Sequence, residues 1–148
     1  DTQYDPNNFD TVSYEQVVTE FEDTDISFSP NVIVGNTLTF TPVKNGSIAL
    51  LSKYVGNQFL DNTSDDGKSI DAYFVNNLNV SYKIQPKWIK EIGFNLLVNN
   101  LFNSEYVSNG YTYSYFYRPL GSSDAAITEN FYYPQARTNF LIGATLRF

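Results

Sequence analysis

The feature that most constrains the fold of this chain is the period-two alternation at its end. From Phe140 to Phe148 the even positions are all apolar, and the odd positions are smaller or more polar, with Leu141 as the exception. Successive side chains of a β-strand point to opposite faces, so this pattern predicts a strand with one apolar face. About ten such residues suit a tilted membrane-spanning strand that has one face in lipid and the other in a hydrated lumen. We expect residues 131–148 to form this terminal strand.

The same alternation recurs four times upstream, in residues 32–40, 48–55, 74–84 and 92–99. The contrast is strongest in 74–84, where apolar side chains alternate with Tyr, Asn, Ser and Lys. The fourth segment is expected to continue past Asn103 into a stripe of tyrosines. Asn45-Gly46 predicts a tight turn, because Asn-Gly readily adopts positive φ values. A second short turn is predicted at 85–91, and longer loops at 1–30, 60–70 and 118–131.

Short turns on one side and long loops on the other are typical of outer-membrane barrels. We therefore expect an all-β fold, an antiparallel transmembrane β-barrel segment of about five strands. Residues 1–30 are expected to form an extracellular acidic loop and residues 31–148 the membrane strands. The lone Trp88 lies beside Lys87 and Lys90 and resembles an anchor at the surface of outer-membrane lipid. Single-chain barrels begin at about eight strands, so the strands seen here would belong to a larger barrel.

Composition excludes several classes of function. The chain has no Cys and no His, which removes disulfides, thiolate or imidazole metal ligands and the commonest general base. We expect no enzymatic activity, no cofactor and no metal site. A calcium-loop pattern starting at Asn62 fails, because its twelfth position is Tyr73 instead of Glu. The net charge of -7 argues against nucleic-acid binding, and eight of the 16 acidic residues fall in the first 25 positions.

Candidate ligand-binding residues follow the fourth strand: Tyr111, Tyr113, Tyr115, Tyr117 and Arg118. The tyrosines are spaced to lie on one face of a strand, where they would stack on an aromatic or sugar ligand, or would form an aromatic girdle or loop packing. Arg118 and Arg137 would bind a carboxylate or phosphate of a ligand, or pair with acidic loops. The acidic segment 1–25 would bind Ca²⁺ or repel acidic ligands, or it would be a solvated loop, which is the alternative that we favour.

Several segments of the chain form an ordered set of motifs. The segment Asn99-Asn100-Leu101-Phe102-Asn103-Ser104-Glu105-Tyr106 contains the pattern Asn-Leu-Phe-Asn-x-x-Tyr. Gly110-Tyr111, residues 132–140 and the final Phe148 follow it, and residues 26–31 and 54–63 precede it. In order and spacing these segments resemble the end of the TonB-dependent outer-membrane receptors, in the form found in the Bacteroidetes, with 26–31 and 54–63 similar to two family strands around a periplasmic turn. The resemblance covers about residues 26–148.

The resemblance implies a 22-stranded barrel plugged by an N-terminal domain that lies upstream of this chain. Such receptors import scarce ligands, namely ferric siderophores, haem, cobalamin, glycans or peptides, across the outer membrane of Gram-negative bacteria. The energy comes through TonB with its partners ExbB and ExbD. The implied partners are the rest of the barrel and its plug, and also a surface lipoprotein where the ligand is a glycan or peptide.

The end of the chain also resembles the signal that the barrel-assembly machinery reads. Gly143, Leu146 and Phe148 match that pattern, whereas Leu141 stands where the pattern has a polar residue. Phe148 would then lie at the seam where the last strand of a barrel meets the first.

Two other functions remain open from the residues alone. One is a non-transporting outer-membrane barrel, a porin or adhesin subunit with the same strand chemistry. The other is a soluble all-β binding module, for example a sandwich. The module would be soluble without detergent, whereas the apolar faces read here predict aggregation in water.

Overall fold

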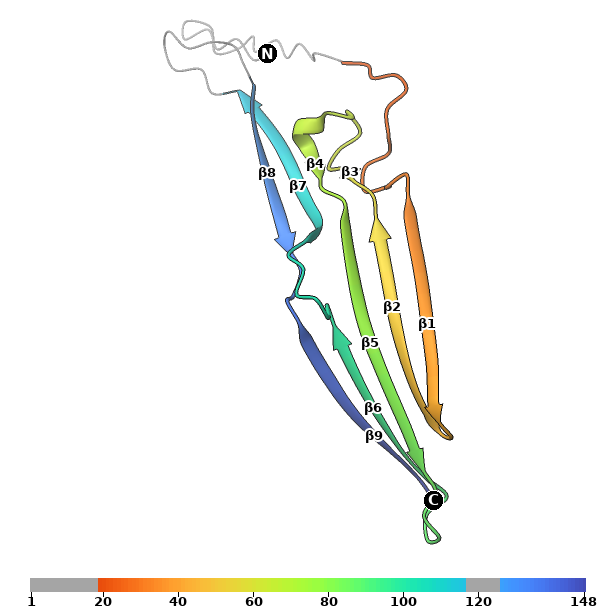
Figure 1. Cartoon of the computed structure of the whole chain (residues 1–148). Helices are drawn as coiled ribbons and strands as arrows, with labels where there is room; N and C mark the ends of the chain where they lie inside the picture. Colours follow the sequence, from red (N-terminus) through yellow and green to blue (C-terminus); the bar gives the residue numbers. More distant parts are fainter. Residues whose placement is uncertain (1–18, 117–125) are drawn as a thin grey trace, which may run out of the picture.

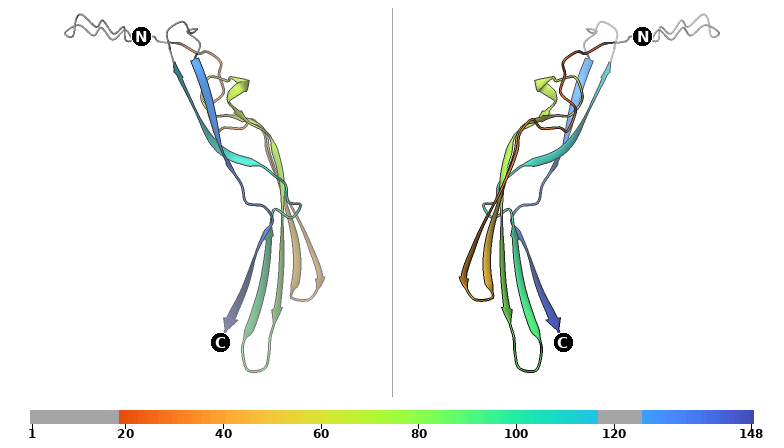
Figure 2. Two further views of the ribbon diagram at one scale, coloured as in Figure 1. Left: turned by 90° about the vertical axis from the view of Figure 1, so that its left-hand side faces the viewer. Right: turned by 90° about the vertical axis from the view of Figure 1, so that its right-hand side faces the viewer.

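The computed structural model describes residues 19–116 and 126–148, and it is all-β with antiparallel sheets. The main sheet has five strands in the order β1-β2-β5-β6-β9 (Figure 1). Their bounds are β1 Ile33–Val43, β2 Gly46–Val55, β5 Tyr73–Ile84, β6 Glu91–Asn99 and β9 Asn139–Arg147. These are the five alternating segments that the sequence predicts. Seen from the side, the described part of this sheet is a single twisted layer (Figure 2).

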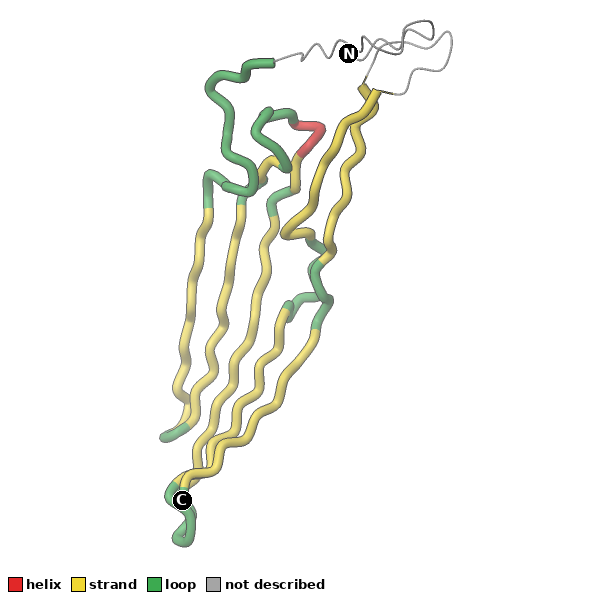
Figure 3. The backbone as a smooth tube through the Cα atoms, turned by 180° about the vertical axis from the view of Figure 1, so that it is seen from behind, coloured by secondary structure: helices red, strands yellow, loops and turns green. Residues whose placement is uncertain are grey.

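One end of the main sheet is closed by two short turns, which we call the turn end. Lys44 and Asn45 join β1 to β2, and residues 85–90 join β5 to β6, as predicted (Figure 3). Asn45 has φ 69°, the left-handed value expected for a tight turn. Gly46 is needed for a different reason, since a Cβ there would lie 2.8 Å from Val43 Cγ2.

The opposite end, which we call the loop end, contains the buried core. Two short strands pair there, β3 Gln58–Phe59 and β4 Ser69–Ile70, with the 3-10 turn η1 Asp66–Lys68 between them. The most buried hydrophobic side chains among the described residues are Val55, Leu60, Ile70, Val75 and Ile89, and all but Ile89 lie at or near this end. The main sheet below it has no comparable core in the described chain.

The segment before β1 folds onto this core through its backbone. The amide of Asp25 donates to Ser64 Oγ at 2.8 Å, and that of Ser27 donates to Asn62 Oδ1 at 2.7 Å. Within the loop, Lys68 Nζ lies 3.0 Å from Asp61 Oδ2. Burial acts to raise the pKa of Asp61, but hydrogen bonds from Thr63 and Lys68 outweigh it and lower the pKa overall.

The last two segments differ from the prediction of continuous strands. β6 ends at Asn99, and after residues 100–106 the chain forms β7 Val107–Phe116. β8 Ala126–Pro134 pairs with β7 and is separated from β9 by residues 135–138. The expected terminal strand 131–148 is therefore two strands, and the expected loop 118–131 is already strand from Ala126. Both breaks lie at the same level, so β7 and β8 extend β6 and β9 towards the loop end (Figure 1).

Candidate functional site

The five strands place like side chains in rows across the main sheet. The register aligns one row of Leu38, Leu50, Leu78, Val98 and Phe140, and a second row of Phe40, Ile48, Val80, Leu96 and Ile142. We call this side of the main sheet the apolar face. Much of it is exposed in the described structure, with Ile142 75% and Phe140 68% accessible. Exposed apolar surface on this scale marks contact with a partner or with lipid.

A polar row crosses the apolar face near the loop end, formed by Asn36, Ser52 and Asn76. Ser52 Oγ donates to Asn76 Oδ1 at 2.6 Å, and Asn76 is almost completely buried. Beyond that row the face returns to apolar and aromatic side chains at Val34, Tyr54 and Phe74.

The opposite side of the main sheet, which we call the polar face, carries mostly small and amide side chains. Ser47 and Ser81 share a hydrogen bond of 2.8 Å, and Asn99 Nδ2 donates to Asn139 Oδ1 at 2.9 Å. Leu51, Leu97 and Leu141 are apolar residues within this face, and towards the loop end it becomes apolar at Ile33, Val55 and Val75. This chemistry suits contact with water or with a neutral polar ligand.

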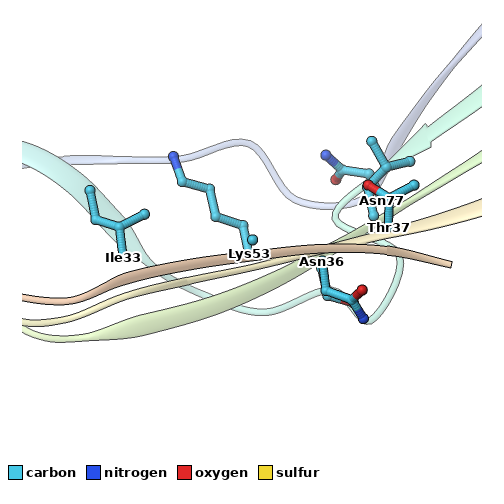
Figure 4. Close-up of a pocket in the computed structure, with 8 residues that line it drawn as sticks. Ile33, Asn36, Thr37, Lys53 and Asn77 are labelled. Carbon is cyan, nitrogen blue, oxygen red and sulfur yellow. The ribbon is translucent and has the colours of Figure 1, made fainter.

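A shallow hollow of about 360 Å³ lies along β1 and β2, and Figure 4 shows how side chains there alternate between the two faces of the sheet. Ile33, Thr37 and Lys53 stand on one side of the sheet with Asn77, whereas Asn36 points to the other. Because residues of both faces line it, the hollow is a feature of the sheet edge and not an enclosed pocket. Lys53 is its only charged residue.

The predicted tyrosine stripe forms part of an aromatic ladder on one face of β7 and β8. Its members are Tyr111, Tyr113, Tyr115, Phe131 and Tyr133. Tyr111 and Phe131 have ring centroids 4.9 Å apart at 10°, and Tyr113 and Phe131 lie 5.9 Å apart at 5°. Near-parallel neighbours use their ring faces on one another, so the ladder presents mainly ring edges and hydroxyls to a ligand.

Glu129 lies opposite Tyr113 and joins the ladder through its carboxylate. Tyr113 donates its hydroxyl to Glu129 Oε2 at 2.8 Å, and Tyr115 donates to Oε1 at 3.2 Å. The hydrogen bond to Glu129 raises the pKa of Tyr113, and the charge of Glu129 raises the pKa of Tyr115. Sequence reasoning missed Glu129, because only the cross-strand register brings it to the tyrosines.

The other face of β7 and β8 packs on the core of the loop end. A Cβ on Gly110 would lie 2.5 Å from the Phe131 carbonyl oxygen and 3.1 Å from Leu60 Cδ2. Asn130 Nδ2 donates to the Gly67 carbonyl at 2.6 Å, and Tyr132 donates its hydroxyl to the Ser69 carbonyl at 3.0 Å. The loop β3-η1-β4 thus orients the hairpin, and the aromatic ladder lies on its opposite face.

Asn100 organises the break between the main sheet and the β7-β8 hairpin. It has φ 50° and is only 2% exposed. Its Nδ2 donates to the carbonyls of Ser104 at 2.8 Å and Ala136 at 3.2 Å, and its Oδ1 accepts from the Ser104 amide at 2.9 Å. Thr138 Oγ1 donates to the Asn100 carbonyl at 2.6 Å. The Asn-rich motif at 99–106 therefore has a structural role in this chain.

The remaining predicted site residues are dispersed. Tyr117 and Arg118 lie outside the described residues. Arg137 forms an ion pair with Glu105, which agrees with the pairing alternative for that residue. Gly143 and Leu146 lie on β9 with Phe148 just beyond it, and a Cβ on Gly143 would meet nothing within 4 Å. Nothing in the geometry brings these three to the aromatic ladder.

Residues 19–116 and 126–148 contain no group of three or more acidic side chains that could hold a metal ion. Across the same residues, no helix is long and apolar enough to cross a membrane.

Neither a family model, nor a curated protein, nor a solved structure matches this chain. Its function must therefore be argued from its own residues. The geometry offers three surfaces: an exposed apolar face, an opposite polar face and an aromatic ladder with one carboxylate.

Proposed function

We propose that the five-stranded sheet spans an outer membrane as part of a TonB-dependent receptor that imports a scarce ligand. The observation that carries the membrane part is the pair of five-residue apolar rows aligned across all five strands, which are exposed on β1 and β9 and half-buried on β5 and β6. Such rows in water would promote aggregation, whereas lipid solvates them. The polar face would then line a hydrated lumen.

The dimensions of the apolar face support this proposal. On β5 the face runs from Phe74 to Ile84, ten residues apart with the polar Asn76 just inside the Phe74 end, which is about 33 Å of strand and about 25 Å at a tilt of 40°. That length matches the apolar band of outer-membrane barrels, about 25 Å. Aromatic side chains occur towards both ends, with Tyr54 and Phe74 at one and Tyr82 and Phe94 at the other. They would form the two interfacial girdles.

The sheet edges also favour a barrel. Within the described chain, the outer edges of β1 and β9 have no neighbouring strand. Unpaired backbone groups in lipid cost several kcal/mol each, so both edges would need to pair with further strands. Closure with strands of the same receptor would supply these partners.

The transport part of the proposal rests on the receptor-like motifs and on the surfaces at the loop end. The aromatic ladder would contact the ligand on the outer side, with hydroxyls and the Glu129 carboxylate as hydrogen-bonding groups. In cells that carry the protein, uptake of its ligand (a siderophore, haem, cobalamin, glycan or peptide) into the periplasm should stop when TonB is deleted or the proton gradient is collapsed. Uptake that persists would favour a porin, and absence of any uptake would favour an adhesin.

Membrane insertion is tested by one substitution on each face of the same strand. Leu78→Asp places a carboxylate on the apolar face, and Asn79→Asp places the same group on the polar face. We expect Leu78→Asp to lower the yield of folded, heat-resistant protein in outer membranes severalfold and Asn79→Asp to leave it nearly unchanged. Equal insertion of both variants would contradict the lipid-facing assignment, and absence of the wild type from outer membranes would favour the soluble module.

A further inference from the structure

Charge is separated along the length of the molecule. Among the described residues, the turn end carries one carboxylate, Glu91, and five cations: Lys44, Lys83, Lys87, Lys90 and Arg147. The loop end and the level of the breaks carry ten carboxylates and three cations in the described chain. The two ends therefore have opposite net side-chain charge.

The single carboxylate of the turn end neutralises only part of its positive charge. Glu91 Oε1 lies 3.4 Å from Lys83 Nζ and 3.9 Å from Arg147 Nη1. Lys44, Lys87 and Lys90 are exposed and form no ion pair with another described residue. Lys44, Lys87 and Lys90 therefore have no acidic side chain as an ion-pair partner among the described residues.

Apolar side chains lie beside these cations. Within the 85–90 turn, Ile89 is 8% exposed and anchors the turn, whereas Trp88 is 79% exposed and contributes little to packing. Phe148 is also 79% exposed. Residues 85–90 and Phe148 together border an open hollow of about 510 Å³. The row of Ile84, Ile92 and Leu146 continues from there onto the apolar face.

We propose that the turn end is a binding surface for anionic phospholipids of the leaflet that it meets. The Lys87 and Lys90 ammonium groups would pair with headgroup phosphates, and Trp88 would lie at the headgroup level with its ring against the upper acyl chain. The rest of the lipid acyl chain would pack against the row of Ile84, Ile92 and Leu146. Uncompensated positive charge favours an anionic headgroup over a zwitterionic one.

This inference rests on the proposed membrane insertion, and the single tryptophan makes it measurable. Trp88 is the only Trp of the chain, so its fluorescence reports on the turn end directly. The protein is placed in phosphatidylcholine vesicles that contain a dibrominated lipid, either phosphatidylglycerol or phosphatidylcholine, at equal mole fraction. We expect the brominated anionic lipid to quench Trp88 at least about fivefold more effectively at low salt, which is the preference that one Lys contributes.

The preference should depend on the two turn lysines. Lys87→Gln/Lys90→Gln is expected to abolish most of it, whereas Lys53→Gln, an exposed cation at the loop end, should retain it. High NaCl should weaken the preference by screening. Millimolar inorganic phosphate, compared with NaCl of the same ionic strength, should not displace the lipid, and specific displacement would identify a free-phosphate site and overturn the proposal.

The outcomes separate this inference from the proposed function. Equal quenching by both brominated lipids, or a preference unchanged in the double variant, would overturn the lipid site and leave membrane insertion intact. Absence of quenching by either lipid, together with normal insertion of Leu78→Asp, would overturn both.

Discussion

Gly110 and Gly35 differ in the space around an added Cβ atom. An alanine would clash at position 110 and would fit at position 35. A Cβ on Gly110 would lie 2.5 Å from the Phe131 carbonyl oxygen, a backbone atom of the paired strand. A Cβ on Gly35 would meet nothing within 4 Å. Close approach of β7 to β8 and Leu60 therefore depends on the missing side chain at 110.

We expect Gly110→Ala to loosen the β7-β8 hairpin, because the backbone must move to accept the methyl group, at a cost of about 1–3 kcal/mol. Amide hydrogen exchange across β7 and β8 should accelerate, while exchange in β5 stays unchanged. The matched variant Gly35→Ala should leave both regions as they are. Unchanged exchange in Gly110→Ala would show that the hairpin is not held as closely as the geometry requires.

Glu129 changes the pH at which two tyrosines of the aromatic ladder ionise. The pKa values of Tyr113 and Tyr115 are raised by Glu129 above the ordinary 10.0. A phenol with a raised pKa is held neutral in the folded hairpin, so its stabilising contribution is present below about pH 10 and is lost as pH rises through the folded pKa.

In Glu129→Gln both phenols should ionise closer to their ordinary pKa. Spectrophotometric titration near 295 nm should therefore show part of the tyrosinate absorbance at lower pH than in the wild type. Glu20→Gln, an acidic residue outside the ladder, is the control and should leave the curve unchanged. A superimposable curve for Glu129→Gln would mean that the two hydroxyls are not bound to this carboxylate in solution.

At the scale of elements, two breaks in the chain separate the main sheet from the β7-β8 hairpin that extends it. The β6-β9 pairing ends at Asn99 and Asn139, and pairing resumes between β7 and β8 after residues 100–106. Asn100 fills the gap with hydrogen bonds to residues four, 36 and 38 positions away. The alternation in the sequence predicted strands on both sides of the break, but these distant partners are invisible to a local pattern.

Asn100→Ala should disorder this junction. The variant loses three side-chain hydrogen bonds and places Ala at φ 50°, for a combined cost of about 3 kcal/mol or more. Asn100→Gly should recover only the backbone part, since Gly accepts positive φ without a side chain. Denaturation midpoints in detergent should fall furthest for Asn100→Ala and less for Asn100→Gly, while the control Asn95→Ala, an exposed amide of β6, should leave the midpoint nearly unchanged. An equal midpoint for Ala and Gly would show that the backbone conformation contributes nothing.

At the scale of the whole molecule, the two faces of a single-layer sheet must lie in different surroundings. The rows of Leu78 and Val80 are apolar across all five strands, while the alternate positions Asn77, Asn79 and Ser81 are polar. A strand between lipid and lumen has this two-sided pattern, and so does a strand that covers a protein core. Only the surroundings of the apolar face distinguish the two arrangements.

A parity scan along β5 would make that distinction. The chain has no Cys, so a nitroxide attached to one introduced thiol reports on a single position. In membranes, we expect even positions from 78 to 84 to be accessible to oxygen and odd positions from 77 to 83 to be accessible to a water-soluble nickel reagent. Loss of the alternation, or even positions shielded from both reagents, would favour a covered protein core instead.

The sequence by itself determined the strands of the main sheet, the tight turn at Asn45 and the separation of apolar from polar faces. These follow from local physics, since side-chain alternation and turn preferences act within a few residues. Only the tertiary structure decided the breaks at 100–106 and 135–138, the meeting of Glu129 with Tyr113 and Tyr115, and the packing of Gly110 on Leu60. Each of those depends on contacts between residues 14 to 50 positions apart, which strand register sets and local pattern does not.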